Sequence, residues 1–329
     1  MGEPDGTLAQ WARIAEQHDW QALLLGNGLS THVWGRFAYR SLFEQAQRSG
    51  LTKEDEALFA LHGGTNFERV LADLRTAMRV ADVLRLDRAA VAARYRSIRQ
   101  ALGRAVREVH LDRAAVPDAC LRGIREVLRA HQVVFTTSYD LLIYWAMGYG
   151  GSFEPFVDMF RGRPCRFDPF LIEERQVPVY YLHGALHLVV EGSGGTQKLR
   201  WSDRTLLEQF GEPIKDDPEA RPLLITEGDS DGKLIAIEEN DYLLFALEQL
   251  RQWSLPIVVF GSSLGGQDDH LVDALNQHRD RAVAVSMMPT TRRELRKKQN
   301  DIYYRLRCDP LVFFDATTHP LGDPVLRAG

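Results

Sequence analysis

Residues that could bind a phosphate group follow the apolar run Ala22–Leu25 directly, as the turn Gly26-Asn27-Gly28 and then Ser30. Glycines at the carboxyl end of a strand let backbone NH groups and a helix N-terminus approach a pyrophosphate. The spacing Gly-x-Gly-x-Ser lacks the third glycine of the dehydrogenase fingerprint, so a tight structural turn is the alternative interpretation.

Hydroxyl and carboxyl groups follow the second apolar run, Val133–Thr136. Asp140 is placed to cap a helix that carries Leu142 and its neighbours, and capping alone explains this residue. Capping does not explain Thr137 and Ser138, which lie at the carboxyl end of a predicted strand, where ligands of α/β sheets bind.

A histidine follows the third apolar run, residues 179–182. His183 precedes Gly184, which predicts an imidazole at the same sheet edge with backbone room beside it. An imidazole can act as a general base, although a lone histidine in this setting more often has a structural role. His187, beyond the turn, is a weaker candidate.

A second glycine-rich turn follows the run Ile257–Phe260. Gly261, Ser262 and Ser263 come first, and a helix is predicted to start at Asp268 or Asp269. Hydroxyls and unhindered NH groups here could hold a phosphate or a ribose. A plain glycine-rich loop before an Asp-capped helix is the alternative.

Near-continuous apolar runs predict parallel strands covered on both faces. They lie at residues 22–25, 133–136, 179–182, 222–226, 257–260, 282–286 and 312–314, with helical patterns at 241–253, 268–278 and 291–307. The fold class predicted is α/β, with a doubly wound, mostly parallel Rossmann-like sheet. From about residue 40 to 130 the pattern is helical almost throughout, which predicts a large all-helical insertion or cap between the first and second strands. We expect residues 1–329 to form a single domain that contains it, and residues 191–200 to form a hairpin or loop.

Composition and charge limit the classes of function that the sequence supports. The formal charge of −5 does not indicate a protein that binds nucleic acid or membranes, and no apolar run approaches the roughly 20 residues that span a bilayer. The basic stretch 290–307 is a solvated surface helix or, alternatively, a partner or nucleic-acid patch. Three scattered cysteines predict neither a disulfide framework nor a metal site, and with the absence of a signal-like N-terminus they indicate the cytoplasm.

The chain resembles the sirtuin-like (silent-information-regulator-like) NAD-binding superfamily over residues 20–280. Four motifs carry the resemblance, in this order: Gly26-Asn27-Gly28-Leu29-Ser30, Thr136-Thr137-Ser138-Tyr139-Asp140, Leu182-His183-Gly184 and Gly261-Ser262-Ser263-Leu264. It is more similar to a stand-alone bacterial family of domains of unknown function, related to anti-phage NAD hydrolases, which shares segments like 66–74 and 226–247.

This resemblance implies an NAD pocket, with residues 26–30 at the pyrophosphate and Ser262 and Ser263 near a phosphate or ribose. His183 would correspond to the catalytic histidine. Sirtuin deacetylases carry a zinc module with four cysteines, which this chain cannot build, so no metal is expected. The implied activity is NAD glycohydrolysis, releasing nicotinamide and ADP-ribose, in bacterial anti-phage defence by NAD depletion. The expected partners are NAD or ADP-ribose and an activating protein of a defence system; a homo-oligomer is left open.

Ser138 departs from the pattern of the related proteins, and this difference leaves more than one hypothesis of function open. The related proteins have Asn-Tyr-Asp where this chain has Ser138-Tyr139-Asp140, and their Asn orients the water and the nicotinamide ribose. Serine is shorter and has no amide. The chain is therefore an NAD hydrolase, or else a catalytically weak or silent NAD or ADP-ribose sensor that regulates a partner protein. An interaction protein that works through its helical insertion is a third reading.

Overall fold

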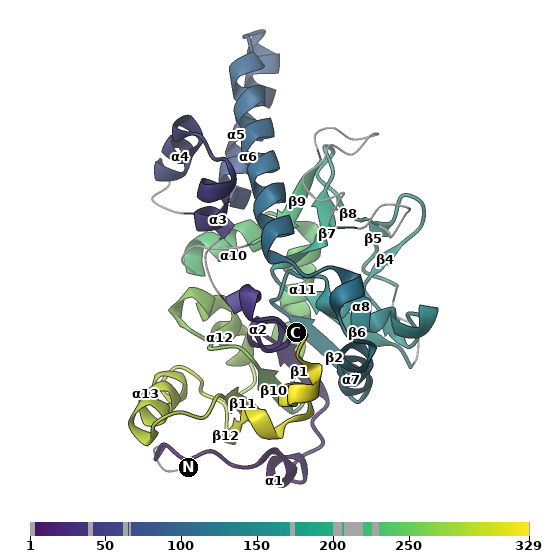
Figure 1. Cartoon of the computed structure of the whole chain (residues 1–329), viewed down its shortest axis with the longest axis vertical. Coiled ribbons are helices and arrows are strands. Elements are labelled where there is room, and N and C mark those ends of the chain that lie inside the picture. The colour runs from purple at the N-terminus through teal and green to yellow at the C-terminus, as the bar shows by residue number, and fades with distance from the viewer. Residues whose placement is uncertain are drawn as a thin grey trace.

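A seven-stranded sheet in which every neighbouring pair is parallel organises the structure (Figure 1). The computed structural model describes residues 4–38, 42–61, 65, 67–171, 175–199, 206, 220–225 and 230–328. The strand order is β12-β11-β10-β1-β2-β6-β3. The strands are β1 (Ala22–Leu25), β2 (Val133–Thr136), β3 (Phe156–Val157), β6 (Val177–Tyr181), β10 (Ile257–Phe260), β11 (Val283–Met287) and β12 (Leu311–Asp315).

Burial explains why these runs form strands. Every residue of β1, β2, β10 and β11 is buried, as expected for parallel strands with both faces covered. Without β3, the order from β6 to β12 is that of the doubly wound dinucleotide-binding folds, whose order reverses between the first and fourth strands. The predicted fold class is confirmed.

Helices connect the strands of this sheet. Arg281, which is 1% exposed, joins two of these connections because its guanidinium donates to the carbonyl oxygens of Trp253 and Leu275. The helices outside the insertion are α1 (Trp11–Ala15), α2 (Gly28–Val33), α7 (Asp118–Arg129), α8 (Leu142–Met147), α10 (Ser230–Glu238), α11 (Asp241–Gln252), α12 (Asp269–Leu275) and α13 (Arg292–Tyr303). Short 3₁₀ turns are η1 (Gly35–Ala38), η2 (Arg113–Ala115), η3 (Tyr149–Gly151), η4 (Gly266–Asp268), η5 (Ala316–Thr318), η6 (Pro320–Gly322) and η7 (Pro324–Leu326).

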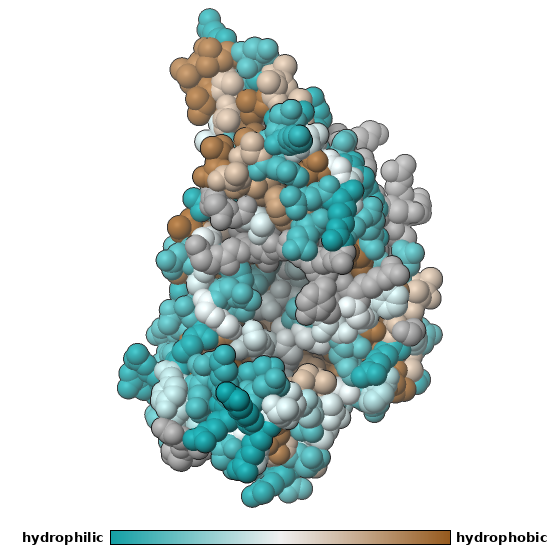
Figure 2. Space-filling model, turned by 60° about the vertical axis from the view of Figure 1, so that its left-hand side comes forward, coloured by the Kyte–Doolittle hydropathy of each residue, from teal (hydrophilic) through white to brown (hydrophobic). Residues whose placement is uncertain are grey.

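The predicted helical insertion lies between β1 and β2. It contains α3 (Leu42–Ser49), α4 (Lys53–Ala60), α5 (Phe67–Leu84) and α6 (Ala89–Val109), and α5 and α6 project together away from the sheet (Figure 1). Phe59 packs against Phe43 and Phe67 at the base of the insertion. Figure 2 shows apolar residues gathered toward the outer end of the hairpin, where Val83 and Leu86 are 82% and 61% exposed.

A second, antiparallel sheet was not predicted. Its order is β4-β5-β8-β7-β9, from β4 (Phe160–Arg161), β5 (Arg166–Phe167), β7 (Gly184–Val190), β8 (Thr196–Lys198) and β9 (Arg221–Leu224). The run 222–226 was expected in the parallel sheet, and that placement is wrong, because β9 pairs with β7. Burial on both faces gives an antiparallel strand the same continuous apolar pattern as a parallel one. The predicted hairpin near 191–200 joins β7 to β8.

Within the described residues, no helix combines the length and the apolar character that crossing a bilayer requires. The three cysteines are buried and have free thiols. The assignment of residues 1–329 to one domain stays a prediction.

Candidate functional site

The strand order reverses between β1 and β10, and a glycine turn follows each of these strands. Hydrogen bonds join the two turns: the Gly26 NH donates to the Phe260 oxygen and the Gly28 NH to the Gly261 oxygen, both at 2.8 Å. Ligands of doubly wound sheets bind in the crevice at this point, beyond the carboxyl ends of the strands. The two turns that the sequence predicts as candidate phosphate-binding sites, at Gly26 and Gly261, therefore meet at this point.

Close backbone packing explains the glycines of both turns. A Cβ atom on Gly26 would lie 2.5 Å from the Gly261 oxygen, and one on Gly28 would lie 2.6 Å from the Gly261 Cα. Gly261 has a φ of +71° and donates its NH to Ser286 Oγ at 2.9 Å. All three glycine NH groups therefore already have protein acceptors, and the glycines serve first to bring the two turns together.

Polar side chains of the two turns remain at the surface. Asn27 is exposed and donates from Nδ2 to the Phe37 oxygen at 3.2 Å. Ser263 is exposed, whereas the partly buried Ser262 accepts the Leu264 NH at 3.2 Å. Asn27 and Ser263 are thus the predicted cofactor-binding side chains most accessible to a ligand.

Ser30, Ser138 and Asp140 form a buried network that joins the turn after β1 to the turn after β2. Ser30 donates to Asp140 Oδ2 at 2.5 Å, and the hydroxyls of Ser30 and Ser138 are 3.1 Å apart. Because the Ser30 proton is directed to the carboxylate, Ser138 is the donor in the second contact. These three side chains are at most 3% exposed.

Backbone contacts fix the end of β2. Asp140 was predicted to cap the next helix; it lies one residue before the N-cap Leu141, and its Oδ1 accepts the NH of Leu142, the first residue of α8, at 2.8 Å. The Thr137 NH donates to the Leu25 oxygen at 2.9 Å. His110 Nε2 accepts the Leu141 NH at 3.0 Å while Nδ1 faces the Leu111 oxygen, which fixes a neutral tautomer with the proton on Nδ1. Burial lowers the pKa of His110, against the opposing effect of Asp140.

Strand register places His183 beside the end of β2. Thr136 pairs with Tyr181, and two residues beyond that pair lie Ser138, after the end of β2, and His183, after the end of β6. His183 is 5% exposed. The backbone room expected beside Gly184 is filled, because a Cβ there would overlap the Leu223 carbonyl group of β9. This glycine serves strand packing, not ligand approach.

The imidazole of His183 faces a second histidine that the sequence reading missed. His183 Nε2 and His270 Nε2 are 2.8 Å apart, and His270 is 2% exposed. Burial is the main cause that lowers the pKa of both rings, to about 4 for His270, where the carboxylate of Asp268 opposes it. The available signal was a histidine in the first turn of the helix after the second glycine turn.

Asp268 lies beside this pair, and its carboxylate and the two imidazoles have ligand atoms within 4.8 Å of one another. Two histidines and a carboxylate can hold a divalent metal. However, Lys233 Nζ lies 3.0 Å from Asp268 Oδ1, so an ammonium already neutralises the carboxylate. No local pattern in the sequence predicts that these residues lie close together.

His187, the weaker candidate, lies in β7 and is fully buried. Its ring packs on Tyr144 and Tyr181, with centroids 4.5 and 4.9 Å away, and neither ring nitrogen has a hydrogen-bond partner among the described residues. Burial holds its pKa well below the usual value. The structure gives His187 a packing role.

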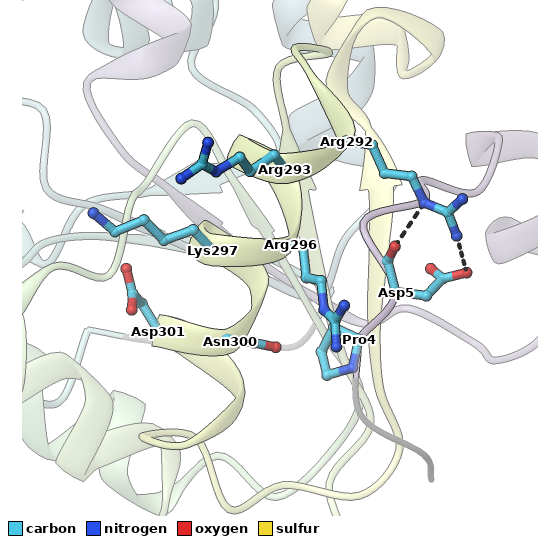
Figure 3. Close-up of a pocket in the computed structure, with 8 residues that line it drawn as sticks. All are labelled: Pro4, Asp5, Arg292, Arg293, Arg296, Lys297, Asn300 and Asp301. Carbon is cyan, nitrogen blue, oxygen red and sulfur yellow. Dashed lines mark hydrogen bonds and ion pairs between the residues drawn. The ribbon is translucent and has the colours of Figure 1, made fainter.

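Two hollows lie away from these residues. One, of about 700 Å³, borders α13, where Arg292 donates to the Asp5 backbone oxygen while Arg293 and Lys297 extend outward (Figure 3). The other, of about 500 Å³, lies at the amino ends of β2 and β6, against Trp253. Neither hollow includes a predicted site residue. The basic stretch 290–307 is the helix α13 and the turn after it, from which Arg305 donates to the Gly265 oxygen.

The chain belongs to the family described as "Domain of unknown function (DUF4917)", whose model matches residues 23–320. No curated protein matches it. Solved structures similar to it include one from work on the mechanism and regulation of Sir2 enzymes, 14% identical, covering 96% of this chain and 94% of that chain, with a TM-score of 0.42. A Sir2 homolog–NAD complex is 12% identical and covers 94% and 89% of the two chains, also with a TM-score of 0.42. Sir2 bound to acetylated peptide is 13% identical and covers 96% and 92%, with a TM-score of 0.41.

Proposed function

We propose that this protein binds NAD at the carboxyl edge of the parallel sheet and hydrolyses its nicotinamide–ribose bond. The observation that carries the proposal is the reversal of strand order between β1 and β10, where the turns at Gly26 and Gly261 meet. Sheets of this order bind dinucleotides at that position. The ends of β2 and β6 bring Ser138 and His183 to the same edge.

The proposed pose has the NAD pyrophosphate against the turn that starts α2, where the helix N-terminus favours negative charge. Asn27 and Ser263 are the exposed polar side chains that support it. The nicotinamide ribose would extend toward the ends of β2 and β6. Thr137 and Ser262, each partly buried, lie along the same edge.

In the proposed reaction the C–N glycosidic bond breaks and its electron pair stays on nicotinamide, which leaves as a neutral molecule. A water oxygen forms the new bond to the anomeric carbon, and its proton passes to His183 and then to solvent. The products are nicotinamide, ADP-ribose and one proton. Burial lowers the pKa of His183, so the imidazole is neutral before the reaction, and the base must form its imidazolium against this effect of burial.

The test is nicotinamide release by the wild type, His183→Ala and His187→Phe. His183→Ala should lower turnover by about a hundredfold or more, because it removes the base. His187→Phe is the matched control: another buried histidine of the same segment, with a ring that packs on tyrosines. Calorimetric titration with NAD should give similar affinities for all three proteins. Unchanged turnover in His183→Ala would exclude this histidine from the mechanism.

A second candidate function, an NAD or ADP-ribose sensor without turnover, is favoured by the surroundings of Ser138. Its hydroxyl is directed at Ser30 inside a buried network. It also has no amide with which to orient a water. Tight binding of NAD or ADP-ribose with no nicotinamide release, with or without an activating partner, would support this function against hydrolysis.

The cellular role proposed with the hydrolase is NAD depletion during phage infection, triggered by a protein partner. It rests on the resemblance in the motifs alone. Measuring cellular NAD after infection, in cells that carry the wild type or His183→Ala, tests it. Equal NAD levels in the two strains would contradict it.

A further inference from the structure

Two buried histidines from distant parts of the chain share one hydrogen bond. His183 Nε2 lies 2.8 Å from His270 Nε2, and their ring centroids are 5.0 Å apart. Between two neutral imidazoles, one nitrogen must carry the proton and the other must offer its lone pair. The contact therefore requires opposite tautomers for the two rings.

Contacts from α10 hold the ring of His270 in place. The His270 NH donates to Ser230 Oγ at 3.1 Å, and the same hydroxyl lies 3.5 Å from His270 Nδ1. One turn of α10 further on, Lys233 pairs with Asp268, just before α12. The two helices lie side by side (Figure 1). His270 is thus attached at its backbone and at its ring.

The two tautomer assignments have different consequences for His183. If His183 donates from Nε2, its Nδ1 keeps a lone pair, and the proton on His270 Nδ1 is directed at Ser230 Oγ. If His270 donates instead, the neutral His183 carries its proton on Nδ1 and has no free lone pair. Only the first assignment therefore leaves a lone pair on Nδ1, with which His183 can act as a base.

We propose that His270 is a positioning residue, which accepts the Nε2 proton of His183 and thereby presents Nδ1 of His183 as the basic atom. The inference rests on the proposed function, since it assigns an atom and an orientation to that base. His270 itself touches no substrate. Its lone pair fixes the tautomer, and the contact of its Nδ1 with Ser230 Oγ orients the ring.

The proton balance needs no further group. When Nδ1 of His183 takes a proton from water or from a ribose hydroxyl, the ring becomes an imidazolium that still donates from Nε2 to His270. A hydrogen bond from a charged donor is stronger than a neutral one, so the contact stabilises the state formed in the reaction. The proton then leaves from Nδ1 to solvent, and His270 stays neutral throughout.

A bound cation is the competing use of these residues. Lys233 counts against it, because its ammonium occupies Asp268 and would repel a metal beside the two imidazoles. A metal would take the lone pairs of both Nε2 atoms and leave the Nε2 of His183 without a proton. The two arrangements therefore differ in a property that can be measured.

The first experiment records ¹⁵N imidazole spectra of the full-length protein and assigns His183 by its loss in His183→Gln. We expect the proton of His183 on Nε2 in the wild type, and a mixture of tautomers in His270→Leu. Val272→Ala, a buried change in the same helix, is the control and should keep the wild-type tautomer. A proton on Nδ1 in the wild type would overturn the proposal. So would a tautomer that His270→Leu leaves unchanged, or a stoichiometric metal lost in that variant.

The second experiment separates kcat from KM for NAD cleavage. His270→Leu should lower kcat by about 10- to 100-fold with KM within about threefold, because only the positioning of the base is lost. His270→Gln should stay within about fivefold of the wild type, since its amide oxygen can accept the same proton. Equal losses in both variants would overturn the proposal. If the wild type releases no nicotinamide, the proposed function fails, whereas the spectra still decide the tautomer.

Discussion

Gly26 and Gly261 pack backbone against backbone, and a Cβ atom on Gly26 would lie 2.5 Å from the carbonyl oxygen of Gly261. The neighbouring atoms are backbone, so they cannot move aside as a flexible side chain would. Gly26→Ala should lower the free energy of unfolding by about 2 kcal/mol or more, measured by urea unfolding. NAD affinity should fall with it, because the turn itself is displaced.

Gly266→Ala is the matched control for this prediction. Gly266 lies in the turn after β10 as well, but no atom comes within 4 Å of its Cβ position. The alanine should leave stability within about 0.5 kcal/mol of the wild type. If Gly26→Ala were as stable as Gly266→Ala and only its NAD affinity fell, the phosphate-approach reading of Gly26 would be correct.

Ser30 is the central hydroxyl of the buried network, because it donates to Asp140 and accepts from Ser138. Ser30→Ala should lower the free energy of unfolding by about 1–3 kcal/mol, since a buried carboxylate oxygen loses its donor. Thr31→Ala, one residue further, removes only a hydroxyl that donates to the Gly28 oxygen and should have a smaller effect. Equal decreases in the midpoint of thermal unfolding in the two variants would show that the hydrogen bond to Asp140 contributes no more stability than the hydroxyl of Thr31.

Local pattern was enough to locate the main strands. β1, β2 and β10 match their predicted bounds, because each is a short apolar run that ends at a glycine or a hydroxyl and is buried on every residue. An apolar run does not indicate which other strand it pairs with. The pattern therefore misplaced β9, whose partner β7 lies in another sheet, and it missed β4 and β5, which are two residues long and too short for any period to show.

The site was predicted only in part, for a related reason. Gly26, Ser138, His183 and Gly261 were predicted as candidates because each follows a strand, and the carboxyl ends of parallel strands meet at one edge. His270 follows a loop and a 3₁₀ turn instead, and its contact with His183 joins positions 87 residues apart in the sequence. Nothing local distinguishes it from an ordinary histidine of an amphipathic helix. The protein acceptors of the glycine NH groups were equally beyond sequence reading.

Stability should fall steeply below a pH of about 6.5, the ordinary pKa of histidine. Six histidines are buried among the residues that the structure describes, and burial lowers the pKa of each, to about 4 for His270 and to about 3 for His319. The unfolded chain therefore binds more protons between the folded and unfolded pKa values, so the free energy of unfolding falls as the pH falls through that window. Each histidine contributes up to about 1.4 kcal/mol per pH unit.

The measurement is urea unfolding at pH 7.5, 6.5 and 5.5, for the wild type and for His187→Phe. The variant removes one of the six groups and the two unpartnered ring nitrogens, and it keeps an aromatic ring between Tyr144 and Tyr181. It should be more stable than the wild type at pH 5.5 and should show a shallower pH slope. A parallel slope in the two proteins would mean that His187 titrates normally in the folded state.

Substitutions at Ser138 distinguish the two proposed functions, NAD hydrolysis and NAD sensing without turnover. Ser138→Asn should raise nicotinamide release at saturating NAD by about tenfold or more, because an amide held at a strand end supplies both a donor and an acceptor in a fixed orientation. NAD affinity should change less, since the proposed contacts of the pyrophosphate lie at the two glycine turns. Ser138→Ala, which keeps the small volume without any polar atom in its side chain, is the control and should be no faster than the wild type.

Because the side chain at position 138 is only 3% exposed, the unfolding of each variant is measured alongside its activity, so that loss of folded protein is not mistaken for slow catalysis. If the serine form is already active and the asparagine form is no faster, another residue such as Asn27 positions the water. If both forms bind NAD and neither cleaves it, the protein is a sensor.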